Sequence, residues 1–126
     1  MPDKKIKILL VEDEEMLANM YETKFKNEGF DIEKALNGED GLKKAKEMLP
    51  DFILLDIIMP KMDGFAVLKS LKKDEKTKNI PVMLLTNLGQ EEDIQRGEEL
   101  GGVGYLVKAN TTPADVVDAV KNKLNK

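Results

Sequence analysis

Five short apolar segments alternate with amphipathic segments along the chain, and this alternation is the feature that most limits the possible folds. The apolar segments are 6–11, 30–35, 52–55, 82–85 and 105–107. The first, third and fourth of them are almost continuously apolar, which is typical of strands buried on both faces of a parallel sheet. The segment 30–35 instead alternates apolar and acidic residues, so we expect it to lie nearer to an edge of the sheet.

The segments between the apolar runs show the spacing of amphipathic helices. Their apolar stripes are Met16, Leu17, Met20, Tyr21 and Phe25; Leu42, Ala45 and Leu49; Phe65, Leu68 and Leu71; and Val116, Val117, Val120 and Leu124. Asn37 and Thr112 are expected to cap helices, the second with Pro113 behind it. A further helix over 91–100 is predicted to be weak because it is mostly charged and contains Gly97. The pattern predicts an α/β domain with a five-stranded parallel sheet, right-handed crossovers and helices on both faces.

The composition narrows the possible functions. A chain of 126 residues that is 41% hydrophobic is expected to form one domain over 1–126. A net charge of −4 with scattered lysines disfavours direct nucleic-acid binding. Because no segment has the pattern of a membrane span or a signal peptide, we expect a cytoplasmic protein that does not bind a membrane. The chain has no cysteine and no histidine, so any metal must be held by oxygen, which favours Mg²⁺.

Polar residues follow the predicted strands at the edge where parallel sheets bind ligands. They are Glu12 and Asp13, then Asp56, Thr86 and Lys108. Clustered carboxylates resist ionisation unless a cation lies among them, and Mg²⁺ meets that need. An ionised aspartate is then a nucleophile toward phosphorus, while lysine, threonine and the metal hold the transferred group. Taken singly, each residue also has an ordinary interpretation as a helix cap, a turn residue or a solvated charge.

The segment Asp56-Ile57-Ile58-Met59-Pro60-Lys61-Met62-Asp63-Gly64 resembles the phosphorylation loop of response regulator receiver domains in two-component signal transduction. The acidic pair after the first strand, the threonine after the fourth and the lysine after the fifth match that family in kind and order. The resemblance extends from Lys5 to Leu124. It implies a doubly wound, flavodoxin-like (βα)5 fold with strand order 2-1-3-4-5.

The resemblance also implies a role for each acidic residue. Asp56 corresponds to the phosphoacceptor and Asp13 to the direct ligand of Mg²⁺. Glu12 corresponds to a second acid that acts through water, and the backbone carbonyl of Ile58 would complete the protein ligands. Mg²⁺ is therefore the expected cofactor.

The implied function is transfer of a phosphoryl group from a sensor histidine kinase, or a phosphotransfer protein, to Asp56. The chain has no histidine, so the donor must be another molecule. Thr86 and Lys108 would contact the phosphoryl group, and Tyr105 corresponds to an aromatic switch residue that turns inward as Thr86 moves. The helix over 91–100, the strand with Tyr105 and the last helix would form the face that binds a downstream output protein. We expect Mg²⁺-dependent self-phosphorylation, with no effector domain among these residues.

Three positions depart from the family pattern. Glu12 stands where aspartate is frequent, and its longer side chain is expected to preserve Mg²⁺ binding. Ala109 stands where proline usually follows the lysine through a cis bond; before a non-proline residue a cis bond costs about 2.5–4 kcal/mol. Either packing holds that bond cis, or the loop differs locally. Asn87 replaces a small residue, and either crowds the phosphoryl site or adds a hydrogen bond to it.

Two apolar residues predict a long-lived phosphoryl group. Ile58 and Leu88 lie two residues after Asp56 and Thr86, where polar side chains in the family help to orient the attacking water. We therefore expect slow self-dephosphorylation.

Other functions fit the chain less well. A phosphorylation-independent binding module with the receiver fold is the main alternative, favoured by Ala109 and Asn87 but opposed by the intact acidic residues. A Mg²⁺-dependent phosphatase with an aspartate nucleophile would need a second acid at the place of Ile58. A flavin-binding protein would need a phosphate-binding loop after the first strand, and the sequence has none.

Overall fold

Strands and helices alternate from end to end in the computed structural model, which describes residues 5–125. The elements are β1 (Lys7–Val11), α1 (Glu15–Asn27), β2 (Asp31–Ala35), α2 (Gly38–Met48), β3 (Phe52–Leu55), α3 (Gly64–Lys73), β4 (Val82–Thr86), α4 (Glu91–Glu99), β5 (Gly104–Val107), the 3₁₀ turn η1 (Lys108–Asn110) and α5 (Pro113–Leu124). The five strands pair in parallel in the order β2-β1-β3-β4-β5. The predicted fold class and strand order are therefore confirmed, and the alternating second strand is an edge strand.

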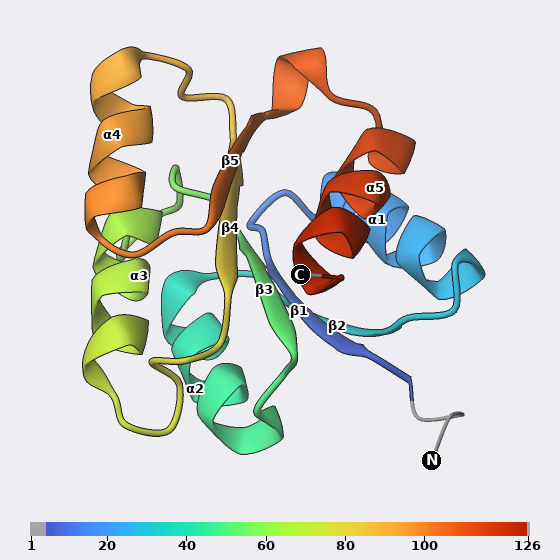
Figure 1. The fold of residues 1–126 in the computed structure, drawn as a ribbon, viewed down its shortest axis with the longest axis horizontal. Helices are drawn as coiled ribbons and strands as arrows, with labels where there is room; N and C mark the ends of the chain where they lie inside the picture. The colour runs from blue at the N-terminus through green and yellow to red at the C-terminus, as the bar shows by residue number, and fades with distance from the viewer. Residues whose placement is uncertain (1–4, 126) are drawn as a thin grey trace.

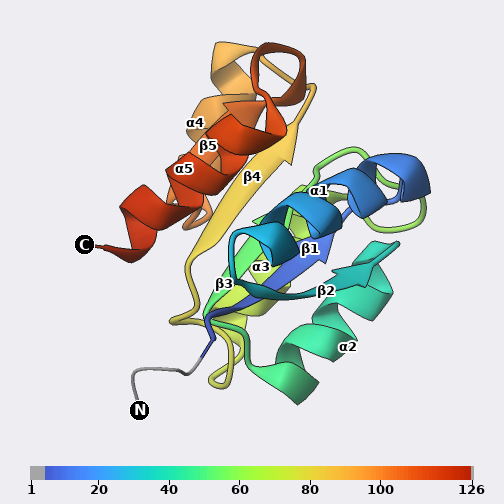
Figure 2. The same cartoon turned by 90° about the vertical axis from the view of Figure 1, so that its right-hand side faces the viewer.

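The sheet lies between two layers of helices. Figure 1 shows α1 and α5 on one face and α2, α3 and α4 on the other, and Figure 2 shows the same layers from the side. Successive residues of the central strands enter opposite cores: Leu10 and Leu54 pack with α1 and α5, whereas Leu9 and Ile53 pack with the other layer. Burial on both faces explains why these strands are continuously apolar.

The predicted caps of α2 and α5 are confirmed. The side chain of Asn37 accepts a hydrogen bond from the backbone N–H of Asp40 at 2.9 Å. The hydroxyl of Thr112 accepts from the N–H of Asp115 at 3.1 Å, and the Asp115 carboxylate accepts from the N–H of Thr112 at 3.0 Å. This reciprocal pair is a capping box, with Pro113 as the first helical residue.

Three residues of the predicted apolar stripes are exposed. Met16 is 87% exposed and Met20 is 44% exposed, because the buried line of α1 passes through Ala18. Residues two positions from that line are turned by about 200° around the helix axis. Leu49 is 52% exposed because α2 ends at Met48, and Leu49 is its C-cap in the left-handed conformation.

The weak helix over 91–100 forms as α4 in spite of its glycine, and the packing shows why. A Cβ atom on Gly97 would lie 2.5 Å from the Cδ1 atom of the buried Leu84. Gly97 therefore lets α4 approach the sheet closely. Among residues 5–125, no helix combines the length and the apolar character that crossing a membrane requires.

Candidate functional site

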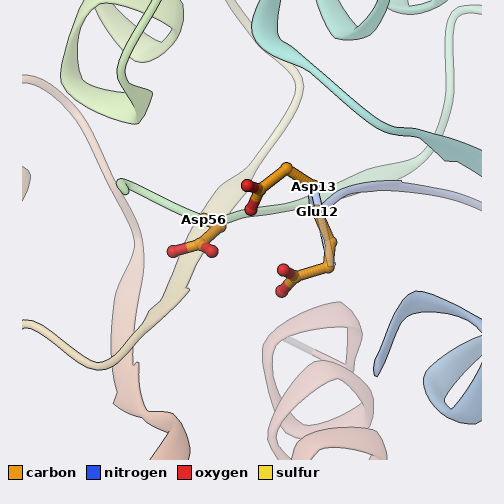
Figure 3. Close-up of side chains that lie close together, drawn as sticks. All are labelled: Glu12, Asp13 and Asp56. Atoms are coloured by element: carbon orange, nitrogen blue, oxygen red, sulfur yellow. The ribbon is translucent and has the colours of Figure 1, made fainter. Parts of the chain in front are cut away.

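Three carboxylates meet beyond the ends of β1 and β3. Glu12 and Asp13 follow β1, and Asp56 follows β3; the two strands are neighbours, with Val11 opposite Leu55. One oxygen from each carboxylate lies within 4.8 Å of the others, and Figure 3 shows the three side chains gathered at this edge. Glu12 and Asp56 are buried, whereas Asp13 is exposed. The structure thus brings together the three acids that the sequence predicted.

Lys108 bridges two of these acids. Its ammonium donates to Asp56 Oδ2 at 2.9 Å and also to Glu12 Oε1. Burial opposes the charge of Lys108, but the hydrogen bonds to Asp56 and Glu12 outweigh it and raise its pKa. Burial also raises the pKa of Glu12, even though Lys108 partly offsets this effect. Glu12 and Asp56 share the one ammonium of Lys108, and Asp13 adds a third carboxylate to the site. The negative charges therefore outnumber the positive charge, which favours binding of a cation.

An open cavity of about 230 Å³ gives access to these groups. It is lined by Glu12, Asp13, Glu14, Asp56, Ile58, Asn87 and Lys108. The N–H of Glu14 donates to Glu12 Oε2 at 3.1 Å, and the N–H of Ile58 donates to Asp56 Oδ1 at 3.3 Å. Glu14 lines the cavity although it was not predicted as a site residue; its place directly after the acidic pair was the signal in the sequence.

Thr86 and Tyr105, the two predicted switch residues, both contact Leu88. Thr86 ends β4 and is fully buried, and its hydroxyl oxygen lies 3.4 Å from the N–H of Leu88. The Tyr105 hydroxyl donates to the Leu88 carbonyl at 2.6 Å. Burial raises the pKa of Tyr105 to about 12, with smaller contributions from the negative charges of Asp93 and Asp56.

The loop after β5 differs from the family pattern. Residues 5–125 contain no cis peptide bond, so the Lys108–Ala109 bond is trans, and Lys108–Asn110 forms a 3₁₀ turn. Of the two alternatives for Ala109, the local difference in the loop is the correct one. Asn87 Oδ1 accepts the N–H of Ala109 at 3.1 Å, so the Asn87 side chain binds the loop backbone.

The donor set fits Mg²⁺. All the candidate ligands are hard oxygen atoms, and the cavity is open, so water molecules can complete an octahedral shell. The chain lacks the imidazole and thiolate ligands that many transition metals prefer, because it has no histidine and no cysteine. The contribution of the Ile58 carbonyl as a ligand stays a prediction.

Comparisons with known proteins agree with this geometry. Residues 8–121 match the family described as the response regulator receiver domain. The chain is 37% identical over 102 residues to the DNA-binding dual master transcriptional regulator RpaA of Synechocystis sp., covering 81% of this chain and 42% of that protein. It is 41% identical over 102 residues to the response regulator PleD of Caulobacter vibrioides, covering 81% of this chain and 22% of that protein.

A solved structure of the chemotaxis protein CheY4 of Vibrio cholerae is similar with a TM-score of 0.89 at 28% identity, covering 94% of this chain and 98% of that chain. In contrast, this chain spans less than half of the length of RpaA and of PleD.

Proposed function

The chain belongs to the response regulator receiver family, and from this we propose that Asp56 accepts a phosphoryl group from a sensor histidine kinase or phosphotransfer protein in a Mg²⁺-dependent reaction. The contact that carries the proposal is the 2.9 Å hydrogen bond from Lys108 to Asp56 inside an acidic cavity. This bond holds the Lys108 ammonium beside Asp56, a buried carboxylate that the cavity makes reachable from outside. The proposal includes a cytoplasmic location and no direct binding of nucleic acid.

Asp13 and Asp56 would hold Mg²⁺ with the Ile58 carbonyl, and Glu12 would act through water. When bound, the ion neutralises the charge between the carboxylates and the incoming phosphoryl group. An oxygen of Asp56 forms the new P–O bond while the P–N bond of the donor's phosphohistidine breaks, and the histidine leaves with the bonding electron pair. Lys108, already next to Asp56, balances the charge of the acyl phosphate that results.

The switching of an output face is part of the same proposal. Thr86 and Tyr105 share a partner, Leu88, in the segment between β4 and α4. If the Thr86 hydroxyl donates to a phosphoryl oxygen, the segment moves, and Tyr105 must find another position for its hydroxyl. The movement would change the face formed by α4, β5 and α5, where an output protein or domain binds.

We infer that the phosphoryl group is lost slowly. Ile58 lines the cavity and is 55% exposed, so its apolar side chain stands beside Asp56 without a polar group to orient water. The double variant Ile58→Asn/Leu88→Glu supplies such groups. After phosphorylation by a small donor, it is expected to lose its phosphoryl group at least several times faster than wild type. Equal lifetimes would contradict this part of the proposal.

Labelling by a small acyl phosphate tests the main proposal. Purified protein incubated with acetyl phosphate and Mg²⁺ is expected to gain the mass of one phosphoryl group, and the gain should vanish in Asp56→Asn or with a chelator. Asp63→Asn is the matched control, because Asp63 lies in the same loop and its capping bond to Ala66 can be made by asparagine. If no labelling and no Mg²⁺ binding occur, the chain is a phosphorylation-independent binding module.

A further inference from the structure

A side-chain hydrogen bond joins two loops at the rim of the acidic cavity. The last paired residues of β4 and β5 are Thr86 and Val107. Directly beyond them, Asn87 Oδ1 accepts the N–H of Ala109 at 3.1 Å. This bond therefore continues the connection between the two strands past the end of the sheet, at the level of Lys108.

The bond depends on the residue types at both of its ends. Position 109 can donate only because it is not proline, which has no backbone N–H. Position 87 can accept only because asparagine carries a side-chain oxygen at the required reach, which alanine and glycine lack. The two departures from the family pattern at Asn87 and Ala109 are thus the two partners of one contact.

The position of Lys108 depends on this part of the backbone. On one side, Lys108 follows β5. On the other side, Asn87 binds the N–H of the next residue, Ala109. Thr111 closes the turn with two hydrogen bonds: its hydroxyl donates to the Val107 carbonyl at 2.7 Å, and its N–H donates to the Lys108 carbonyl at 3.2 Å. Because the Lys108 ammonium must reach both Glu12 and Asp56, a shift of the turn changes both contacts.

We propose that Asn87 is a positioning residue for Lys108: by accepting the Ala109 N–H, it fixes the turn from which the lysine reaches the phosphoacceptor. The part that concerns the phosphoryl group rests on the proposed function, whereas the positioning of Lys108 does not. Asn87 also lines the cavity, and its amide nitrogen carries two N–H donors that the bond to Ala109 does not use.

Four variants separate this role from general stability. Asn87→Ala removes the acceptor, and Ala109→Pro removes the donor. Asn87→Asp keeps an acceptor oxygen, and Ala109→Gly keeps the N–H. NMR hydrogen exchange is expected to show an Ala109 amide that is protected in wild type and Asn87→Asp but not in Asn87→Ala. The Lys108 ammonium signal should be observed in wild type and Asn87→Asp, and should broaden in Asn87→Ala.

Binding of beryllofluoride with Mg²⁺, a mimic of the phosphoryl group, supplies the functional measurement. Asn87→Ala and Ala109→Pro are each expected to weaken binding about fivefold, the effect of losing one neutral hydrogen bond. The double variant should be no weaker than either single variant, because both remove the same bond. Ala109→Gly should bind beryllofluoride within about twofold of wild type, since it removes only the methyl group and keeps the backbone N–H that Asn87 binds.

The outcomes are distinct. Additive losses in the double variant, or an Ala109 amide and a Lys108 signal that do not respond to Asn87→Ala, would overturn the positioning role. Wild-type protein that binds no beryllofluoride would overturn the proposed function, while the response of the Lys108 signal to Asn87→Ala would still support the positioning role.

Discussion

Gly64, the first residue of α3, lies directly against the backbone of Asp56. A Cβ atom on Gly64 would lie 2.2 Å from the Asp56 carbonyl oxygen and 2.6 Å from Ile57 Cα. The N–H of Gly64 also donates to the Ile57 carbonyl at 2.8 Å, so α3 cannot move away without losing this bond. Since both clashing atoms belong to the backbone, a change of side-chain rotamer cannot relieve them.

The cost of Gly64→Ala follows from this geometry. Overpacking usually costs 1–3 kcal/mol, and an overlap with rigid backbone places this variant at about 3 kcal/mol or more. With an unfolding entropy of about 2.1 cal/mol/K per residue, a loss of 3 kcal/mol in a chain of 126 residues lowers Tm by about 11 °C. The displaced Asp56 should also be phosphorylated more slowly by acetyl phosphate.

Thermal denaturation followed by circular dichroism tests this value, with Gly89→Ala as the control. A Cβ atom on Gly89 would meet only Val107 methyl groups, at 3.5 Å and 3.8 Å, which is ordinary contact. The control is therefore expected to stay within about 0.5 kcal/mol, or about 2 °C, of wild type. If Gly64→Ala melts as close to wild type as the control does, the argument from backbone overlap is wrong.

Three further predictions concern local features. Lys61 is exposed with φ of 71°, so Lys61→Gly should raise the free energy of unfolding by about 0.5–1 kcal/mol in urea denaturation, and a decrease would contradict this. Hydrogen bonds from Thr112 lower the pKa of Asp115, so the stabilisation by the Asp115 carboxylate is present above its unfolded-state pKa and is lost as the pH falls through its folded-state pKa. The free energy of unfolding of Asp115→Asn in urea should therefore depend less on pH below about 4 than that of wild type. An unchanged pH dependence would contradict this prediction. Tyr105→Phe should remove the part of the tyrosinate absorbance that Tyr105 contributes near pH 12, leaving that of Tyr21, and should cost about 1 kcal/mol of stability because the Leu88 carbonyl loses a partner; a titration with the wild-type amplitude would refute this.

Local patterns in the sequence were sufficient for the α/β class and for the edge that carries the site, whereas the strand order came from the resemblance to the receiver family. Apolar periodicity identifies strands and helices, because it depends on neighbours a few residues apart. Parallel strands end at one edge, so the sequence alone predicts that Asp13, Asp56 and Lys108 lie together. Periodicity was wrong at Met16 and Met20, because it does not separate apolar side chains beside the buried line of α1 from those within it, and that line passes through Ala18.

The remaining features depend on contacts between distant parts of the chain, which only the tertiary structure determines. Three contacts show this: the bridge from Lys108 to both Glu12 and Asp56, the bond from Ala109 to Asn87, and the overlap that excludes a side chain at Gly64. Each depends on the close approach of atoms from different elements or loops. Such distances follow from how the layers pack, and no local periodicity encodes them. The sequence therefore determined which residues meet at the site, and the packing decided which atoms bond there.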